Sequence, residues 1–181
     1  MTKVIFATSN VGKLKEAQEV LGIEVIGREL PIEEIQSLDT KKVALEKARA
    51  YYKEIKEPLF VEDVALTFNA MNGLPGTYIN DFSKALNNEG LIELLKNRPD
   101  KSAVAITTLV YLDETGEYIF EGDMKGTIVE SPRGDKGFGW DPIFAPSGSI
   151  KTLAEMEMVE KNNYSMRAMA LKKLAEFLKT K

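Results

Sequence analysis

Apolar positions near the start of the chain change from the spacing of a strand to that of a helix. Residues 4–7 form a short apolar run bounded by polar residues, which predicts a buried strand. Leu14, Ala17 and Leu21 then recur three and four residues apart, which places them on one stripe of a helix. A strand that leads directly into an amphipathic helix is typical of α/β proteins.

The rest of the chain shows an alternating pattern first and an antiparallel one later. The pattern predicts a strand at residues 24–27, a loop at 30–38, a helix from Asp39 or Thr40 to about Ile55, a strand-like run at 59–66, helices from about Tyr78 and around 91–95, two β-rich runs at 102–112 and 118–129 joined as a hairpin, and a helix at 164–178. The expected fold is α/β, a long twisted mixed β-sheet with flanking helices. No repeat or linker divides the 181 residues, so we expect a single domain, 1–181.

Small polar residues and a lysine stand at the junction of the first strand and helix. Thr8, Ser9 and Asn10 are good capping residues, and Gly12 and Lys13 fall in the first helical turn. A helix N-terminus at the carboxyl end of a strand offers free N–H groups and a positive dipole end, which suit phosphate. The junction therefore predicts a phosphate site. An ordinary capped turn has the same composition, so this motif does not decide the function by itself.

Two carboxylates lie at or near the end of the strand-like run 59–66. Glu62 and Asp63 are followed by Val64, Ala65 and Leu66, so the acids stand inside apolar sequence. Buried acids cost free energy unless they are paired or bind a metal. In an extended chain the two side chains point to opposite faces and need not share one role. A strand emerging into solvent is the alternative, but the apolar residues that follow favour a functional site.

A loop at residues 136–144 interleaves glycines with large aromatic residues. Gly137 and Gly139 separate Phe138 and Trp140, and Phe144 closes the segment. Aromatic side chains on such a loop can stack on a nucleobase, which is worth ~1–3 kcal/mol per base in proteins that bind single strands. They can equally fill a core beneath the loop.

Histidine and cysteine are absent from the chain. Their absence excludes Ser-His and Cys-His nucleophiles, disulfides, and zinc held by these ligands. Carboxylates, lysines and a hard cation such as Mg²⁺ remain for hydrolysis. The net charge of −4 argues against a nucleic-acid partner, and no apolar run approaches the ~20 residues that span a membrane. Without a signal-peptide pattern, we expect a cytoplasmic protein that acts on a small molecule.

Four motifs in order resemble those of the inosine triphosphate pyrophosphatases. They are TSNVGK at residues 8–13, VED with LTF and GLPG within 61–76, GFGWDPIF at 137–144, and KN with a following Ser and Arg within 161–167. The resemblance implies hydrolysis of the non-canonical purine nucleotides ITP, dITP and XTP to the monophosphate and pyrophosphate, with Mg²⁺. It also implies two lobes around a central nucleotide-binding cleft, and a homodimer.

The resemblance implies roles for individual residues as well. It assigns Thr8, Asn10, Lys13 and Lys47 to phosphate binding, Glu34 and Asp63 to the metal, with Asp63 also the catalytic residue that activates water, and Phe138, Trp140, Asp141, Lys161, Ser165 and Arg167 to base and nearby phosphate contacts. Lys47 lies on the flank of its helical stripe, where a lysine usually serves only as a surface residue. Its phosphate role therefore rests on the resemblance.

The chain departs from the family pattern at two positions. Members usually have a histidine between the serine and the arginine, where this chain has Met166, and a small or polar residue after the aspartate, where it has Val64. Methionine forms no strong hydrogen bond, so one base contact is lost or replaced by packing. We nevertheless predict that position 166 faces the base.

Three alternatives remain open from the sequence. A septum-inhibitor-like nucleotide pyrophosphatase has a similar opening motif but another substrate, although GFGWDPIF favours the inosine type. A non-catalytic nucleotide-binding regulator would retain the fold, but the presence of Lys13, Glu34 and Asp63 argues against it. A structural or interaction protein could use the aromatic loop as an interface, which the phosphate and carboxylate motifs do not support.

Overall fold

The computed structural model describes residues 3–181, which belong to two compact units. Unit 1 consists of the chain up to Asp63 together with Thr107–Gly122 and Arg167–Lys181. Unit 2 consists of Val64–Ile106 and Asp123–Met166. Three long strands have residues in both units, and each unit is described by itself below.

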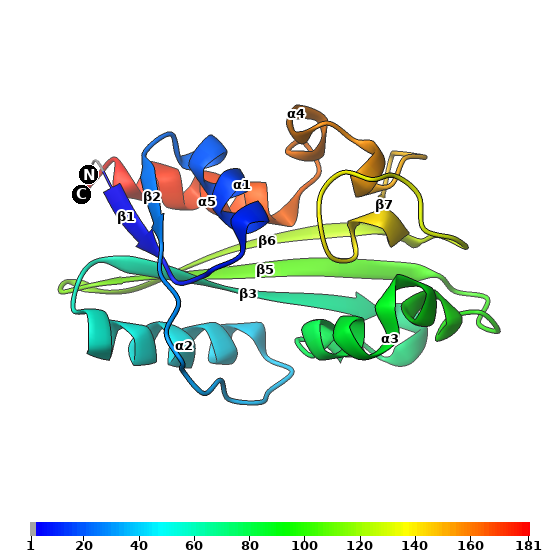
Figure 1. The fold of residues 1–181 in the computed structure, drawn as a ribbon, viewed down its shortest axis with the longest axis horizontal. Coiled ribbons are helices and arrows are strands. Elements are labelled where there is room, and N and C mark those ends of the chain that lie inside the picture. Colours follow the sequence, from blue (N-terminus) through cyan, green and yellow to red (C-terminus); the bar gives the residue numbers. More distant parts are fainter. Residues whose placement is uncertain (1–2) are drawn as a thin grey trace. The chain divides into compact units, whose positions relative to one another are not determined.

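The elements follow the predicted α/β pattern (Figure 1). In chain order they are β1 Lys3–Phe6, α1 Val11–Leu21, β2 Glu24–Gly27, α2 Thr40–Ile55, β3 Leu59–Phe68, β4 Pro75–Gly76, α3 Ile79–Glu93, β5 Ser102–Asp113, β6 Gly116–Ile128, β7 Phe144–Pro146, α4 Met158–Lys161 and α5 Met166–Leu178. The strands pair in the order β2-β1-β3-β5-β6-β7, with β4 also paired to β3. The β1 strand is parallel to β2 and β3, whereas β4 and β7 are antiparallel to their partners. The sheet is therefore mixed, as the sequence predicted.

Unit 1 buries both faces of its strands. Val4 and Phe6 of β1 belong to an apolar cluster with side chains of α1 and α5, and the Phe6 ring stacks on Phe60 with centroids 4.3 Å apart. Ile5 and Ala7 belong instead to a cluster with side chains of α2. Figure 1 shows the same arrangement, with α1 and α5 on one side of β1 and α2 on the other. Because neighbouring strand residues point to opposite faces, an uninterrupted apolar run serves both clusters.

The predicted helix starts in unit 1 are confirmed at the level of single capping residues. The side chain of Asn10 accepts the backbone N–H of Lys13 at 3.0 Å and caps α1. Asp39 caps α2 by accepting the N–H groups of Lys41 and Lys42. These bonds satisfy donors that the first helical turn leaves without a partner.

Unit 2 has a single apolar cluster. Leu66 and Phe68 of β3 contribute to it, as do Leu91 of α3 and the pair Ile143 and Phe144 that follows the aromatic loop. The loop is therefore anchored in the core at its C-terminal end. That position leaves the preceding residues 136–140 at the surface or half-buried.

Three details of the predicted elements were wrong. The β3 strand continues to Phe68, so Glu62 and Asp63 lie inside the strand and not at its end. Both side chains are buried, and Glu62 can be accommodated there because Lys13 and Arg167 pair with it. The two helical segments around 78 and 91–95 are one helix, α3, with a kink at Asn87. The last helix begins at Met166 rather than at residue 164. Among the described residues, no helix is long and apolar enough to cross a membrane.

Candidate active site

The junction between β1 and α1 is a tightly hydrogen-bonded turn in unit 1. The backbone N–H of Asn10 donates to the hydroxyl of Thr8 at 3.1 Å, and the Asn10 side chain caps the helix. Lys13 therefore stands in the first turn of α1, as predicted. The positive end of the helix and the ammonium group together favour an anion here.

A cluster of four charged residues, three of them buried, lies at this turn. Glu62 of β3 accepts the Nε–H of Arg167 at 2.6 Å through one carboxylate oxygen, and its other oxygen lies 2.9 Å from the Lys13 ammonium. Arg167 of α5 also pairs with Glu16 of α1 at 2.5 Å. The Glu62 side chain is 1% exposed and that of Arg167 is 6% exposed. Two positive and two negative charges make the cluster neutral, which offsets the cost of burial.

These contacts keep Glu62 and Arg167, the two residues at the centre of the cluster, in their charged forms. Burial alone would raise the pKa of Glu62, but Arg167 and Lys13 outweigh it and lower that pKa to about 2. Burial alone would lower the pKa of Arg167, but Glu62 and Glu16 raise it further above its ordinary value. Arg167 is thus held by carboxylates on two different elements.

Asp63 is buried close to both positive and negative side chains. Its Oδ2 atom has no hydrogen-bond partner among the described residues. Burial raises the pKa of Asp63 to about 7; the positive charges of Lys47 and Lys13 act in the opposite direction, whereas Glu34 and Glu62 raise it further. A carboxyl with a pKa near neutrality can exchange a proton at physiological pH, which suits a general base.

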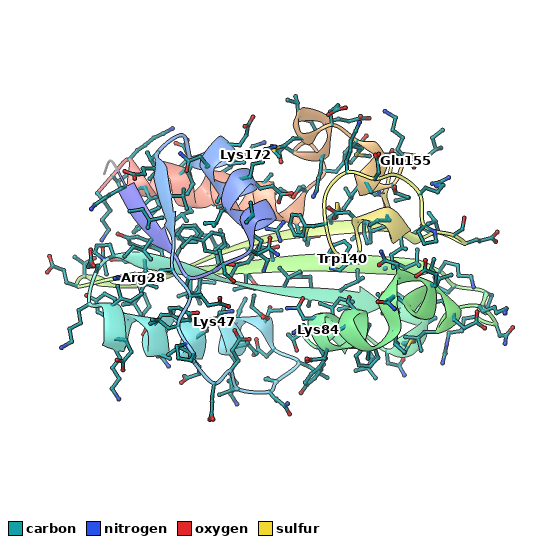
Figure 2. All side chains as sticks on the ribbon, in the orientation of Figure 1. Arg28, Lys47, Lys84, Trp140, Glu155 and Lys172 are labelled. Atoms are coloured by element: carbon teal, nitrogen blue, oxygen red, sulfur yellow. The ribbon has the colours of Figure 1, made fainter. Side chains whose placement is uncertain are left out.

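Glu34 and Lys47 form an ion pair beside this aspartate. Glu34 lies in the loop between β2 and α2. Lys47, labelled in Figure 2, lies on α2. The Lys47 side chain is 15% exposed, so the predicted flank position is largely covered. The electrostatic influence of both residues on Asp63 shows that the three charges act on one region of unit 1.

The donor set is compatible with Mg²⁺. No group of three or more acidic side chains that could hold a metal occurs among residues 3–181. Mg²⁺ does not require one, because it commonly binds one or two carboxylates and completes its shell with water and substrate phosphates. The buried carboxylate of Asp63 and the half-exposed carboxylate of Glu34 are oxygen donors of the kind that such a site takes.

The aromatic loop of unit 2 is organised by a buried ion pair. Asp141 accepts the backbone N–H of Phe138 at 2.9 Å and the Lys161 ammonium at 2.7 Å. The Lys161 nitrogen also lies 4.9 Å from the centroid of the Phe138 ring. Trp140, labelled in Figure 2, packs against Phe144 with ring centroids 5.5 Å apart. Asp141 and Lys161 therefore fix the conformation of the loop to which they belong or which they contact.

The structure distributes the predicted residues between the two units. Unit 1 contains Thr8, Asn10, Lys13, Glu34, Lys47, Asp63 and Arg167, and unit 2 contains Phe138, Trp140, Asp141, Lys161 and Ser165. Arg167, predicted with the base-binding residues, forms ion pairs with Glu16 and Glu62 in unit 1. Ser165 is buried and its N–H donates to the carbonyl of Lys161 at 2.9 Å.

Position 166 differs from the expectation. Met166 is 3% exposed and belongs to the apolar cluster of unit 2. Its thioether is flexible enough to fill a gap in such a cluster. Met166 is therefore packed in the apolar core of unit 2, whereas the sequence predicted that this residue faces the base.

Two members of the charged cluster were not predicted as site residues. Glu62 is an acid inside an apolar run, but the sequence pattern assigns it no role. Glu16 follows Lys13 by three residues, so the two lie on neighbouring positions of one helix face. That spacing is the signal that could have found Glu16, whereas its pairing with Arg167 is not visible in the sequence.

Comparisons with known proteins agree over nearly the whole chain. The model of the Ham1 family matches residues 4–177. A protein of Candida glabrata named inosine triphosphate pyrophosphatase is 45% identical, over 98% of this chain and 97% of the relative. A protein of Methanopyrus kandleri named dITP/XTP pyrophosphatase is 39% identical, over 98% and 96%. The structure of a HAM1 protein from Coxiella burnetii superposes with a TM-score of 0.86 at 30% identity, over 100% of both chains.

Proposed function

Because the chain belongs to the Ham1 family, we propose that it hydrolyses the non-canonical purine nucleotides ITP, dITP and XTP to the monophosphate and pyrophosphate. Relatives that match almost end to end carry the names inosine triphosphate pyrophosphatase and dITP/XTP pyrophosphatase. The observation that carries the proposal within the structure is Asp63, a buried carboxyl with an unpartnered oxygen near two lysines.

The proposed reaction begins with water attacking the α-phosphorus. Asp63 accepts a proton from that water at Oδ2, an atom that has no hydrogen-bond partner among the described residues. The bond from the α-phosphorus to the bridging oxygen then breaks, and pyrophosphate leaves. Lys13 and Lys47 bind phosphate oxygens and neutralise their charge, so positioning and electrostatics supply most of the rate enhancement.

Glu34 and Asp63 are the residues that would hold Mg²⁺. When bound, the ion would offset the negative charge of the phosphates and of the leaving pyrophosphate. Lys47 would remain close to Glu34 and limit the charge that accumulates there. We place this activity in a cytoplasmic homodimer built from one domain per chain.

The base would be recognised by residues of unit 2. The rings of Phe138 and Trp140 offer flat apolar surfaces, and the Lys161 ammonium offers a donor that suits a 6-oxo group. A donor placed for a 6-oxo group discriminates against a 6-amino base, because the donor would then lose its partner. Discrimination against guanine requires a further penalty on its 2-amino group.

The decisive experiment is a panel of nucleoside triphosphates assayed for pyrophosphate release, with Mg²⁺ and with a chelator. We expect release from ITP, dITP and XTP, little from ATP and GTP, and none with the chelator. Asp63→Asn should lower kcat by at least about 100-fold, as the loss of a general base does. Asp123→Asn, at an exposed position, is the matched control.

Other outcomes would point to the alternatives. Release from a different set of nucleotides would favour a septum-inhibitor-like pyrophosphatase. Nucleotide binding without release would favour a regulator. A folded Asp63→Asn protein with most of its activity would remove this residue from the mechanism.

A further inference from the structure

The α3 helix of unit 2 contains a strained residue at its kink. Asn87 has φ 57° and ψ −175°, a region that residues other than glycine rarely enter. Such a conformation is strained and persists only where the surrounding structure holds it in place.

Asn88 reaches from this kink to the aromatic loop. Its side-chain N–H donates to the backbone carbonyl of Gly139 at 3.1 Å. Gly139 stands between Phe138 and Trp140, the two rings proposed to contact the base. Figure 2 labels Trp140 and, on α3, Lys84, and α3 contacts the turn at Asp141–Ile143 directly. The side chain of Asn88, next to the strained residue, thus donates a hydrogen bond to the backbone between the two aromatic residues.

The loop is fixed differently on its two sides. On the Phe138 side, the buried Asp141 carboxylate holds the backbone N–H. On the Trp140 side, Gly139 has φ 61°, and open space surrounds the position that its side chain would occupy. No atom packs at the position of a Gly139 side chain, so the bond from Asn88 restrains a residue whose backbone has wide conformational freedom.

We propose that Asn88 is a positioning residue for base discrimination. By holding the Gly139 carbonyl, it sets the face that Trp140 presents to the purine. Loss of this bond lets the loop sample other conformations and weakens the difference between a correct and an incorrect base. The role in base discrimination rests on the proposed function. The hydrogen bond between Asn88 and Gly139 does not depend on it.

Tryptophan fluorescence tests the contact without any substrate. Trp140 is the chain's single tryptophan, so its emission and its quenching by acrylamide report on this loop alone. We expect Asn88→Ala and Asn88→Asp to increase quenching of the free protein. The aspartate variant has the size of asparagine but presents only acceptors to the Gly139 carbonyl, so it separates hydrogen bonding from packing.

Two further variants on the same helix serve as controls. Asn80→Ala removes an exposed asparagine of α3 and should leave quenching unchanged. Asn87→Gly relieves the strained conformation and should raise the unfolding temperature while keeping the loop in place. Circular dichroism of each variant establishes that α3 has formed.

Kinetics then test the role in discrimination. The ratio of kcat/KM for ITP to that for GTP should fall roughly two- to tenfold in both Asn88 variants, which is the value of one ordinary hydrogen bond. The kcat for ITP should change little. Unchanged quenching in both variants would overturn the proposal, and increased quenching with an unchanged ratio would overturn the role in base choice. If the wild-type protein releases no pyrophosphate at all, the proposed function fails, and the quenching result still decides whether Asn88 positions the loop.

Discussion

The ammonium group of Lys13 lies 2.9 Å from a carboxylate oxygen of Glu62 that is buried beneath it. Lys13 is 20% exposed, so one side of the ammonium faces the buried acid and the other remains accessible. Because Arg167 holds the second oxygen of Glu62, the acid is fixed in orientation as well as in charge. The lysine that is proposed to bind phosphate is therefore held in place by a residue that cannot itself reach solvent.

Replacing Glu62 should damage both stability and substrate binding. Glu62→Gln leaves Lys13 and Arg167 without their shared anion, and breaking a buried pair in this way typically costs about 3–5 kcal/mol. We expect the free energy of unfolding in urea to fall accordingly and KM for ITP to rise. The matched control is Glu57→Gln, because Glu57 is exposed and pairs with Arg28 only at the surface, at 3.5 Å. Equal effects of the two substitutions would contradict a special role for the buried acid.

Lys13→Ala should weaken binding of the triphosphate far more than binding of the free nucleoside. The lysine acts on phosphate and not on the base, and a charge-assisted hydrogen bond is worth about tenfold in affinity. Isothermal titration calorimetry with both ligands measures the difference. Lys15→Ala, an exposed lysine on the same helix, should affect neither. Similar losses for nucleoside and triphosphate would show that Lys13 only supports the fold.

Met166→His should destabilise the protein and leave base choice unchanged. Met166 is buried in an apolar cluster, where a polar ring costs about 2 kcal/mol. Burial lowers the pKa of a histidine below its unfolded value of about 6.5, so the loss of stability should grow as the pH falls through that value. Thermal melts between pH 8 and 5 test this, with Met166→Leu as the control. A sharper preference for ITP over GTP would instead show that position 166 contacts the base.

The cost of replacing Asp113 should change with pH in the opposite direction and become smaller as the pH falls. Burial would raise its pKa, but hydrogen bonds from Thr115 and the ammonium of Lys181 outweigh it and lower the pKa to about 2. The lowered pKa stabilises the fold above the unfolded value of about 3.9, and this contribution disappears as the pH falls through 2. Asp113→Asn should therefore cost about 1 kcal/mol at pH 7, allowing for solvent screening, and nothing near pH 2. Urea titrations across this range, with the exposed Glu114→Gln as control, measure the difference.

Local features of the fold were predictable because they depend on neighbouring residues. The caps at Asn10 and Asp39 require only a short polar side chain before a helical stripe. The hairpin around Asp113 and Gly116 follows from β-rich runs that flank a glycine-containing turn. Each of these rules acts within a few residues, and the structure confirms them.

The contacts that define the site depend on distant residues. Arg167 meets Glu62 from 105 residues away and Glu16 from 151 residues away. No pattern of spacing predicts such a pairing, which tertiary packing alone creates. The same holds for Met166, whose burial depends on which neighbours fill the cluster around it. The family pattern identified residue types at these positions but could not say what each side chain touches.

The division of unit 1 into separate stretches of chain determines the order in which the protein can fold during synthesis. Ala170 and Leu174 of α5 share an apolar cluster with Val4 and Phe6 of β1, so the first strand completes its packing only when the last helix has been made. Unit 2 is complete once Met166 has been added. The contacts of β1 with α1, α2 and β3 can form early in translation, whereas those with α5 must wait until the last helix has been made. The part of the β1 surface that α5 covers is therefore exposed in every nascent chain that lacks the last helix.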